Sequence, residues 1–354
     1  MAVFDGHNGS EASEMASELL LEYFVLHTYF LLDVTYSFLA RKLIRRLPDN
    51  GDSGSDFQKT ILEESFPFEL LKEALLRAIH DIDTAFSMDA PRYNVSSGTT
   101  ATIALLADTQ ILVANIGDSK AFLCSEIFQS PSEAKATVFR VARQRRADGV
   151  SSSLKEYHHL KSMASHGWTY LIAKELTNDH HPDRDDEKSR VESAGGNITK
   201  WAGVARVNGQ LAVSRAIGDI NFKSFGVISV PEVTDWLPLT VNDSYVIIAS
   251  DGVFEKLKPQ DVCDTLSEPL SRFTTSPEFN SSCLISLADC IVNTAFERGS
   301  MDNMAAITIP VRDHMITLED RSCDYLAVGD QRQIYENSSD SPFLNSSQFV
   351  LLLF

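Results

Sequence analysis

The stretch Met1-Ala2-Val3-Phe4-Asp5-Gly6-His7-Asn8-Gly9 decides which fold and which chemistry the sequence predicts. Its apolar start predicts a β-strand, and the strand ends in a turn that brings together a carboxylate, a backbone carbonyl and an imidazole. An Asp-Gly pair alone most often marks a hairpin turn. The stretch therefore predicts part of a metal site only if other carboxylates reach the same point.

Three further aspartates occur at the ends of apolar segments. Asp118 and Asp251 each follow a strand-like segment, and Asp302 shortly precedes one. Carboxylate and carbonyl oxygens are the ligands that Mg²⁺ and Mn²⁺ prefer in proteins. Four carboxylates at strand ends therefore predict a site for hard cations that forms only when the chain folds.

The composition is that of a globular protein with a strongly acidic surface. The 354 residues are 44% hydrophobic and 23% charged, enough for one large domain or two small ones. The formal net charge of −18 argues against nucleic acid as a partner, because the surface repels phosphate backbones. The five cysteines include no CxxC pair, so we expect no thiolate metal site and a reducing compartment, the cytoplasm or the nucleus.

The spacing of apolar residues predicts sheets covered by helices, which is typical of the α+β class. Two amphipathic helices are expected over 11–23 and 68–86, and two more from 259 and over 284–298. The expected strands lie at 99–106, 110–114, 121–124, 137–141, 204–213, 227–230, 245–249 and 304–310. We expect a loop over 42–58, an exposed insertion over about 143–166, and a weakly ordered tail over 313–354.

One segment approaches the hydropathy of a membrane span. Residues 23–40 are largely apolar, but they include His27, Asp33 and several hydroxyl groups, which spanning segments usually lack. We expect a buried helix that continues into a loop, without membrane contact. A membrane-anchored signalling protein is the alternative.

A pair of divalent cations in a carboxylate site is suited to phosphoryl transfer. Two such ions stabilise the attacking and leaving oxygens, and a nearby histidine such as His7 can protonate the leaving alkoxide. The sequence contains no P-loop, EF-hand loop or nucleophile elbow, so no covalent nucleophile is expected. Structural alternatives stay open: His7 as a packed turn residue and Asp118 as a turn cap.

Eight short motifs, which lie in order within residues 1 to about 312, give the sequence a resemblance to a known family. They are VFDGHNG (3–9), SGTTA (97–101), VANIGDS (113–119), LTNDH (176–180), AGG (194–196), RVNGQLAVSRAIGD (206–219), ASDG (249–252) and GSMDN (299–303). By these motifs the chain resembles the plant-type members of the protein phosphatase 2C family, which are metal-dependent Ser/Thr phosphatases. The resemblance implies a β-sandwich of two mainly antiparallel sheets flanked by helices, over residues 1–312.

The resemblance also implies a binuclear centre of Mg²⁺ or Mn²⁺ ions that share a bridging hydroxide. Asp5 would bridge both ions, and the Gly6 carbonyl would bind one of them. Asp251 and Asp302 would complete the shell of the other. The substrate would be a phosphoprotein, dephosphorylated at serine or threonine, and we expect the enzyme to be a monomer.

Further roles follow from the same resemblance. His7 would be the general acid, and Asp118 would hold a third, weaker ion. Residues from about 177 to 206 would form a mobile flap beside the site. For the run 214–219 we expect a structural role.

The sequence departs from the family pattern ahead of the first motif. Family members carry an R-x-x-x-E-D-like sequence there, which supplies a phosphate-binding arginine and an acidic residue near a metal. No such sequence precedes Asp5 here, so we expect a sandwich without its first strands and feeble, manganese-dependent turnover. The alternative is a pseudophosphatase that binds phosphoproteins or regulators. Milder departures are Lys120 in place of arginine, Glu255 in place of aspartate, and the insertion over 143–166.

Overall fold

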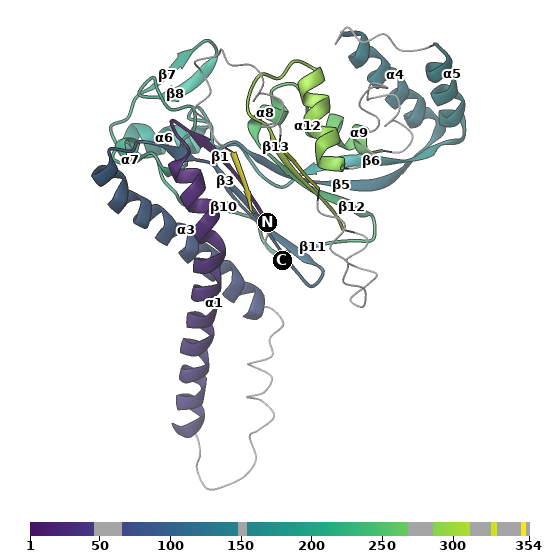
Figure 1. Cartoon of the computed structure of the whole chain (residues 1–354). Helices are drawn as coiled ribbons and strands as arrows, with labels where there is room; N and C mark the ends of the chain where they lie inside the picture. Colours follow the sequence, from purple (N-terminus) through teal and green to yellow (C-terminus); the bar gives the residue numbers. More distant parts are fainter. Residues whose placement is uncertain (46–65, 148–153, 268–285, 312–326, 331–347, 352–354) are drawn as a thin grey trace.

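Two antiparallel sheets form the centre of the computed structural model, which describes residues 1–45, 66–147, 154–267, 286–311, 327–330 and 348–351 (Figure 1). The first sheet has the strand order β10-β4-β3-β1-β2-β9, with β11 also paired to β4 and β15 to β1. Its strands are β1 (Ala2–His7), β2 (Gly98–Thr99), β3 (Ala101–Ala107), β4 (Gln110–Ile116), β9 (Ile217–Gly218), β10 (Glu232–Val233), β11 (Leu237–Pro238) and β15 (Gln348–Leu351). The second sheet has the order β14-β13-β12-β5-β6. Its strands are β5 (Lys120–Gln129), β6 (Trp168–Glu175), β12 (Asp243–Ala249), β13 (Ala305–Pro310) and β14 (Ala327–Asp330).

The two sheets pack face to face because alternate residues of their central strands are apolar on both sides. Val3 of β1 and Val113 of β4 share a buried cluster with Leu123 of β5, Ile248 of β12 and Ile307 of β13. Neighbouring residues of a strand point to opposite faces, so the remaining apolar residues point outward, towards helices. The predicted α+β sandwich of two mainly antiparallel sheets is confirmed.

Helices cover the outer face of each sheet. Phe4 of β1 packs with Leu20 of α1 (Glu11–Arg45) and Ile79 of α3 (Phe66–Tyr93) on the first sheet. On the second sheet, helices α8 (Asp251–Phe254), α9 (Pro259–Leu266) and α12 (Leu287–Glu297) cover the outward face. Two shorter helices, α6 (Asp185–Ser193) and α7 (Ile220–Lys223), lie near a separate hairpin of β7 (Ile198–Trp201) and β8 (Val204–Val207) (Figure 1).

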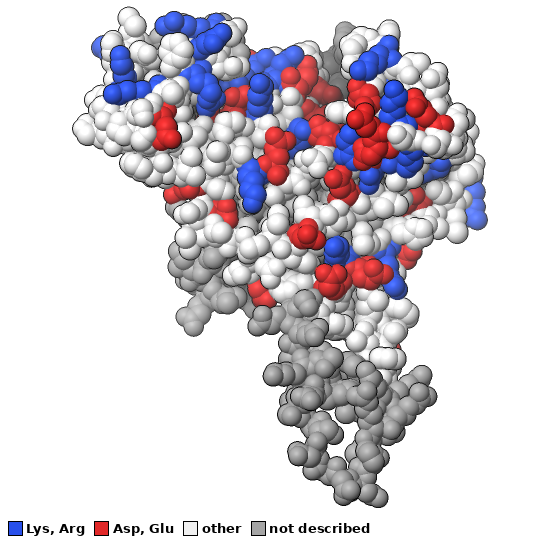
Figure 2. Space-filling model, turned by 180° about the vertical axis from the view of Figure 1, so that it is seen from behind, with Lys and Arg blue, Asp and Glu red and all other residues white. Residues whose placement is uncertain are grey.

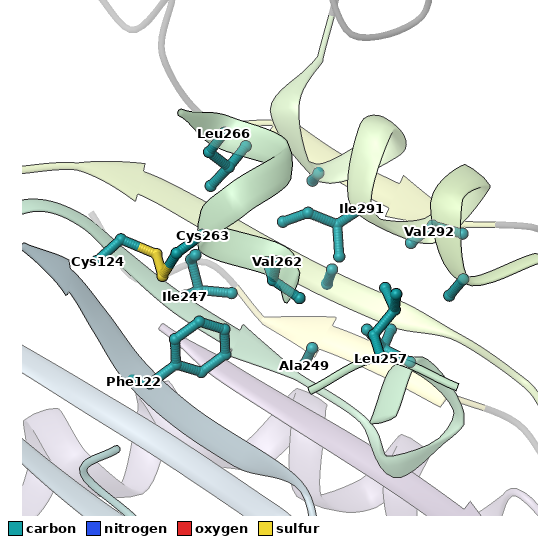
Figure 3. Packing of buried hydrophobic residues seen from close by; sticks show 14 of the residues in the cluster. Phe122, Cys124, Ile247, Ala249, Leu257, Val262, Cys263, Leu266, Ile291 and Val292 are labelled. Atoms are coloured by element: carbon teal, nitrogen blue, oxygen red, sulfur yellow. A yellow bond between two sulfur atoms is a disulfide. The ribbon is translucent and has the colours of Figure 1, made fainter. Parts of the chain in front are cut away.

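The core beneath α9 and α12 contains a disulfide bond. Figure 3 shows Phe122 and Ile247 of the sheet beside Val262 and Ile291 of the helices. Cys124 of β5 is bonded to Cys263 of α9, with their Cα atoms 5.6 Å apart. The sequence analysis did not predict this bond. Cys283 and Cys323 lie outside the described residues.

The segment that we expected to be an exposed insertion over 143–166 is a helical lobe. It consists of α4 (Pro131–Ala147), α5 (Leu154–Met163) and the 3₁₀ turn η1 (Ala164–His166). Val138 and Val141 of α4 are buried against Trp168 and Tyr170 of β6. The expected strand at 137–141 is therefore wrong, and so is the expected loop over residues 143–147 and 154–166. The residues between α4 and α5 lie outside the described part.

The N-terminus of α4 is fixed by a capping interaction. The Ser130 backbone N–H donates to Glu133 Oε2 at 2.8 Å, and the Ser130 hydroxyl donates to the same oxygen at 2.6 Å. Pro131 stands at the first helical position, where its missing N–H costs nothing. The helix is joined to α9 by Arg140, whose Nη2 donates to Asp264 Oδ2 at 2.6 Å.

Several element boundaries differ from those predicted. Helix α1 continues to Arg45 where a loop was expected from 42, and residues 46–58 lie outside the described part. The expected strand over 204–213 is confined to β8, and 227–230 contributes an isolated bridge at Ile228. Strand β6 and helix α6 were not predicted. The expected tail over 313–354 contributes β14 and β15 to the sheets, and its other residues lie outside the described part.

The expected burial of residues 23–40 is wrong. This part of α1 is one continuous helix, and most of its large apolar side chains between Leu21 and Phe38 are substantially exposed. Among the described helices, α1 alone is long and apolar enough over Glu11–Phe38 to cross a membrane, by length and composition. In Figure 1 the helix projects away from the sheets, crossed by α3.

Candidate functional site

Strand β1 places Asp5 near the middle of the first sheet, where its neighbours fix its position. Gly6 pairs with Thr99 of β2, and Val3 pairs with Thr102 of β3. The Asp5 backbone N–H donates to Thr100 Oγ1 at 3.2 Å, and the Thr100 N–H donates to the Asp5 carbonyl at 2.9 Å. The strand end that carries the predicted ligands is therefore held by hydrogen bonds to the neighbouring residues 99–102.

Asp251 and Asp302 come from two adjacent strands of the second sheet. Asp251 opens α8 directly after β12, and Asp302 lies just ahead of β13, the antiparallel neighbour of β12. A glycine allows the two segments to meet: a Cβ at Gly252 would lie 2.1 Å from the carbonyl oxygen of Asn303. Any larger residue at 252 would force the two carboxylates apart.

Asp118 lies in the turn between β4 and β5. Gly117 adopts a φ of 95°, which favours glycine, and its carbonyl accepts a hydrogen bond of 3.0 Å from the His180 backbone N–H. Lys120, the residue found in place of arginine, donates to the carboxylate of Asp179. The turn is thus tied to the segment that follows β6.

Glu255 supports the loop of Asp302. Its Oε2 accepts from the Ser300 hydroxyl at 3.2 Å and from the Met301 N–H at 3.3 Å. It does not line the cavity that the aspartates share.

All the predicted site residues meet at one cavity of about 210 Å³. The lining residues are Asp5, Gly6, His7, Asn8, Thr100, Asp118, Arg206, Gln210, Leu211, Ala212, Val213, Asp251 and Asp302. Strand ends of both sheets contribute to the wall, so the site lies at one edge of the sandwich.

The aspartates destabilise one another's charged forms. Burial raises the pKa of Asp5 well above its usual range, and the neighbouring charges of Asp251, Asp118 and Asp302 raise it further. Burial and the charge of Asp251 also raise the pKa of Asp302, and bring that of Asp118 to about 7. A cluster of anions with few protein cations beside it has the electrostatics of a cation site.

The oxygen ligands of the site suit hard divalent cations, although the side chains are not arranged around a common point as metal ligands would be. Among the described residues, no group of three or more His, Cys, Asp or Glu side chains has atoms close enough to hold an ion as it stands. The four carboxylates nevertheless line one cavity, and burial, together with mutual repulsion, raises the pKa of three of them. Oxygen ligands of this kind suit Mg²⁺ and Mn²⁺.

The sequence analysis did not predict the hydrogen bond between His7 and Asp219. His7 Nε2 lies 2.6 Å from Oδ2 of the buried Asp219. Burial alone would lower the pKa of His7, but the hydrogen bond to Asp219 and its charge outweigh burial and raise it. The run 214–219, for which we expected a structural role, therefore also reaches the site.

Gly98 lies directly beneath this pair. A Cβ at residue 98 would lie 2.2 Å from Asp219 Oδ2 and 2.5 Å from His7 Nε2. The glycine in the motif at 97–101 therefore leaves room for the histidine and the carboxylate to meet, which the sequence alone does not reveal.

Part of the cavity wall comes from β8 and the residues that follow it, at the end of the expected flap. Arg206 and Gln210 line the cavity there, and Arg206 Nη1 donates to the Gln210 carbonyl at 2.6 Å. Ser214 behind this wall has a structural role, as expected: its hydroxyl bonds the His180 carbonyl at 2.9 Å and the carboxylate of Glu187.

Glu187 of α6 binds the segment that contains Ser214 and Arg215. Its fully buried carboxylate accepts hydrogen bonds of 2.5 and 2.7 Å from Arg190 and of 2.7 and 3.0 Å from Arg215. Burial would raise the pKa of Glu187, but the hydrogen bonds from Arg190, Arg215 and Ser214 lower it well below its usual range.

Comparison with known proteins assigns the chain to a family. The model of the family described as protein phosphatase 2C matches residues 1–130 and 163–304. The gap between the two matches falls on α4 and α5, so the helical lobe is an addition to the family pattern.

Curated plant proteins are similar over most of the chain. "Probable protein phosphatase 2C 51" of Arabidopsis thaliana is 53% identical, over 89% of this chain and 64% of its own length. "Putative protein phosphatase 2C 50" of the same plant is 55% identical, over 89% of this chain and 74% of its own length. The chain thus spans about two thirds to three quarters of these relatives.

Solved structures share the fold. A serine-threonine phosphatase 2C from Toxoplasma gondii superposes with a TM-score of 0.56 at 20% identity, over 87% of this chain and 83% of that one. A sex-determining protein of C. elegans gives a TM-score of 0.53 at 21% identity, over 89% of this chain and 58% of that one. By sequence and by fold, the chain belongs to the protein phosphatase 2C family.

Proposed function

We propose that this chain hydrolyses phosphoserine and phosphothreonine in proteins, with two Mg²⁺ or Mn²⁺ ions held by Asp5, Gly6, Asp251 and Asp302. The observation that carries the proposal is the meeting of these residues with His7 and Asp118 at one cavity, although they come from distant parts of the sequence. Asp118, which is half-buried and feels the charge of Asp251, would hold a third ion. Packing alone gives no reason to gather four carboxylates at one point.

The protein groups would bind and position the ions and the phosphate group. When bound, the ions supply charge neutralisation and an activated water for in-line attack on phosphorus. The raised pKa values of Asp5 and Asp302 mean that their charged forms need a cation beside them, which favours tight metal binding. Arg206, the one arginine among the residues that line the cavity, would stabilise the substrate phosphate.

His7 would deliver the proton to the departing serine or threonine oxygen. Its raised pKa favours the protonated ring near neutral pH. The Nε2 proton is held by Asp219, which leaves Nδ1 to donate to the leaving oxygen. Asp219 is therefore a positioning residue that fixes the ring.

The proposal is tested by phosphatase assays on the purified chain with p-nitrophenyl phosphate and a phosphothreonine peptide. We expect hydrolysis that requires Mn²⁺ or Mg²⁺ and stops on addition of a chelator. Asp302→Ala should lower kcat at least roughly 100-fold, because loss of a ligand weakens the ion that polarises the phosphate. Asp235→Asn, at an exposed aspartate outside the cavity, is the matched control and should leave kcat unchanged.

Metal binding is measured separately from turnover. Titration with Mn²⁺ should raise the melting temperature of the wild-type chain and of Asp235→Asn, and raise it much less for Asp302→Ala. A folded wild-type chain that neither binds Mn²⁺ nor hydrolyses either substrate would refute the proposed function.

A further inference from the structure

The helical lobe of α4, α5 and η1 has a charge opposite to that of the rest of the chain. Residues 131–166 include seven Lys and Arg and three Asp and Glu, a net charge of +4, so the remaining residues carry −22. In Figure 2 the lobe lies at the upper left, where blue side chains predominate over red ones. The family model matches the chain on both sides of the lobe and omits residues 131–162, so this basic surface is not part of the family pattern.

The basic side chains of α4 form a stripe along one exposed face of the helix. Lys135, Phe139, Arg143 and Arg146 lie within about 80° of one another around the helix axis. All four side chains are exposed, Phe139 to 65%. Among the side chains that the structure describes, none forms an ion pair with the three basic residues of this stripe. These four residues, the basic stripe, are therefore available to an anionic partner.

The basic stripe belongs to a helix whose opposite face is packed. Val138 and Val141 are buried against Trp168 of β6. Gln129 Oε1 accepts from Thr137 Oγ1 at 3.1 Å and from Trp168 Nε1 at 2.9 Å, which joins α4 to both strands beneath it. Because the helix is already fixed in place, a partner would not have to order its backbone on binding.

The size and charge of the basic stripe favour a short acidic peptide segment. From residue 135 to residue 146 the helix is about 16 Å long, the length of about five residues of extended chain. Exposed charges act over about 8 Å at physiological salt, so such a segment feels the lobe and not the acidic body. A bilayer or a nucleic-acid duplex extends further and also meets a surface whose net charge is −22. Phe139 adds an apolar contact that a peptide side chain can use.

We propose that the basic stripe binds an acidic segment of a protein and, resting on the proposed phosphatase function, that this protein is the substrate. Strand β5 begins two residues after Asp118 of the cavity and ends directly before α4, and its ten residues span about 30 Å. The basic stripe would therefore hold a substrate by a segment remote from the phosphorylated residue. Binding there raises the local concentration of that residue at the cavity.

Fluorescence anisotropy of the full chain with a labelled peptide tests the binding step without turnover. The peptide has about ten residues, Asp and Glu around one Leu, which is long enough to cover the basic stripe. It should bind the wild type, and a peptide with Asn and Gln in place of Asp and Glu should not. The variant Lys135→Gln, Arg143→Gln, Arg146→Gln should bind at least about tenfold more weakly, because three charge pairs are lost. Phe139→Ser should weaken binding about threefold without a change of charge.

A matched control separates the basic stripe from the net charge of the protein. Arg77→Gln, Arg92→Gln, Lys174→Gln removes three positive charges from exposed positions of α3 and β6. This control should bind the peptide within about twofold of the wild type, because its substitutions lie outside the lobe. An equal loss of affinity in both triple variants would show that overall charge attracts the peptide, and would overturn the proposal.

Linked substrates separate docking from catalysis. A phosphothreonine peptide joined to the acidic segment by a flexible linker of about 25 residues should have a lower KM than the unlinked phosphopeptide, with kcat unchanged. A linker of about four residues cannot span 30 Å and should give no such gain. The gain should vanish in the variant that lacks the three basic residues of α4, which should hydrolyse the unlinked phosphopeptide as the wild type does. A chain that binds the acidic peptide but hydrolyses nothing would refute the proposed function and leave the docking site in place.

Other anions give distinct results in the same binding assay. Phosphatidylcholine vesicles that contain phosphatidylserine, and a DNA duplex, should each bind the wild type more weakly than the acidic peptide does. Tighter binding of either one, lost when the three basic residues of α4 are replaced, would assign the basic stripe to lipid or nucleic acid. That result, or no binding of the acidic peptide by the folded wild type, overturns the proposal.

Discussion

The proposed general acid owes its position to a carboxylate far away in the sequence. His7 lies at the end of β1, and Asp219 lies 212 residues further along the chain, immediately after β9. Strand β2 joins the two, because Gly98 pairs with His7 on one side and with Gly218 on the other. Strand β2, which lies between β1 and β9, thus brings Asp219 to the position where it can orient the His7 ring.

Replacing Asp219 should change the pH dependence of turnover. Asp219→Asn removes the charge that raises the pKa of His7, so the histidine loses its proton at a lower pH. Because the acid must be protonated, the alkaline fall of kcat should move to lower pH, and kcat at neutral pH should drop about 10–100-fold. Mn²⁺ affinity should stay the same, and a pH profile that superposes on the wild type would contradict the assigned role.

Gly98→Ala should impair the same pair by displacement. The added Cβ would overlap both Asp219 Oδ2 and His7 Nε2, so the ring must turn away. We expect a loss of kcat similar to that of Asp219→Asn. The double variant should be no worse than either single one, because both changes remove the same interaction. Additive losses in kcat would show that Gly98 acts elsewhere.

Among single residues, the sequence predicts the proposed metal ligands better than the residues that position His7 or line the rest of the cavity. Asp5, Asp251 and Asp302 each lie next to an apolar strand, and a strand end is a local signal. Asp219, Gly98 and the cavity-lining Arg206 have no such signal, because their roles depend on which strands become neighbours. A short stretch of sequence does not show which distant side chains will lie close together after folding.

Among the elements, α6 is held by a buried charge cluster that should dominate its stability. Glu187→Gln leaves Arg190 and Arg215 without their anion and should cost roughly 3 kcal/mol of unfolding free energy. The neighbouring control Asp186→Asn, whose carboxylate is largely exposed, should cost far less. Denaturant titration at neutral pH measures both.

The same cluster predicts how this difference depends on pH. The pKa of Glu187 is depressed in the folded protein, so the native state binds fewer protons than the unfolded chain once the pH falls below its ordinary value of 4.5. The stability advantage of the wild type over Glu187→Gln should be complete above about pH 4.5 and shrink as the pH falls further. An advantage that is independent of pH down to the acid transition would contradict the ionised cluster.

Elements with strong local patterns are predicted, and those decided by packing are not. Strands β3, β4, β12 and β13 are largely apolar because both of their faces are covered. The run Thr137-Val138-Phe139 in α4 resembles a strand because two of its residues are β-branched. The helical signal was nevertheless present: Ala134, Val138 and Val141 lie at helical spacing and are the buried residues of that face.

For the whole molecule, the disulfide should contribute substantially to stability. Cys124 and Cys263 are separated by 139 residues, so their bond restricts a long loop in the unfolded chain. The variant Cys124→Ala, Cys263→Ala should lower the unfolding free energy by roughly 5 kcal/mol in the chain-entropy model. Reduction also opens the disulfide bond of Cys290, so the reduced wild type should lose at least as much stability as the double variant. A wild type insensitive to reductant would show that the bonds do not form in solution.

The position of β1 at the middle of the first sheet governs when the protein becomes active during its synthesis. Asp5 is made first, but its companions Asp251 and Asp302 follow about 250 and 300 residues later, and the strand next to β1 starts only at Gly98. Pairings between such distant segments form slowly and late. The proposed metal ligands would therefore come together only late in folding, and refolding experiments should show secondary structure returning before Mn²⁺ affinity.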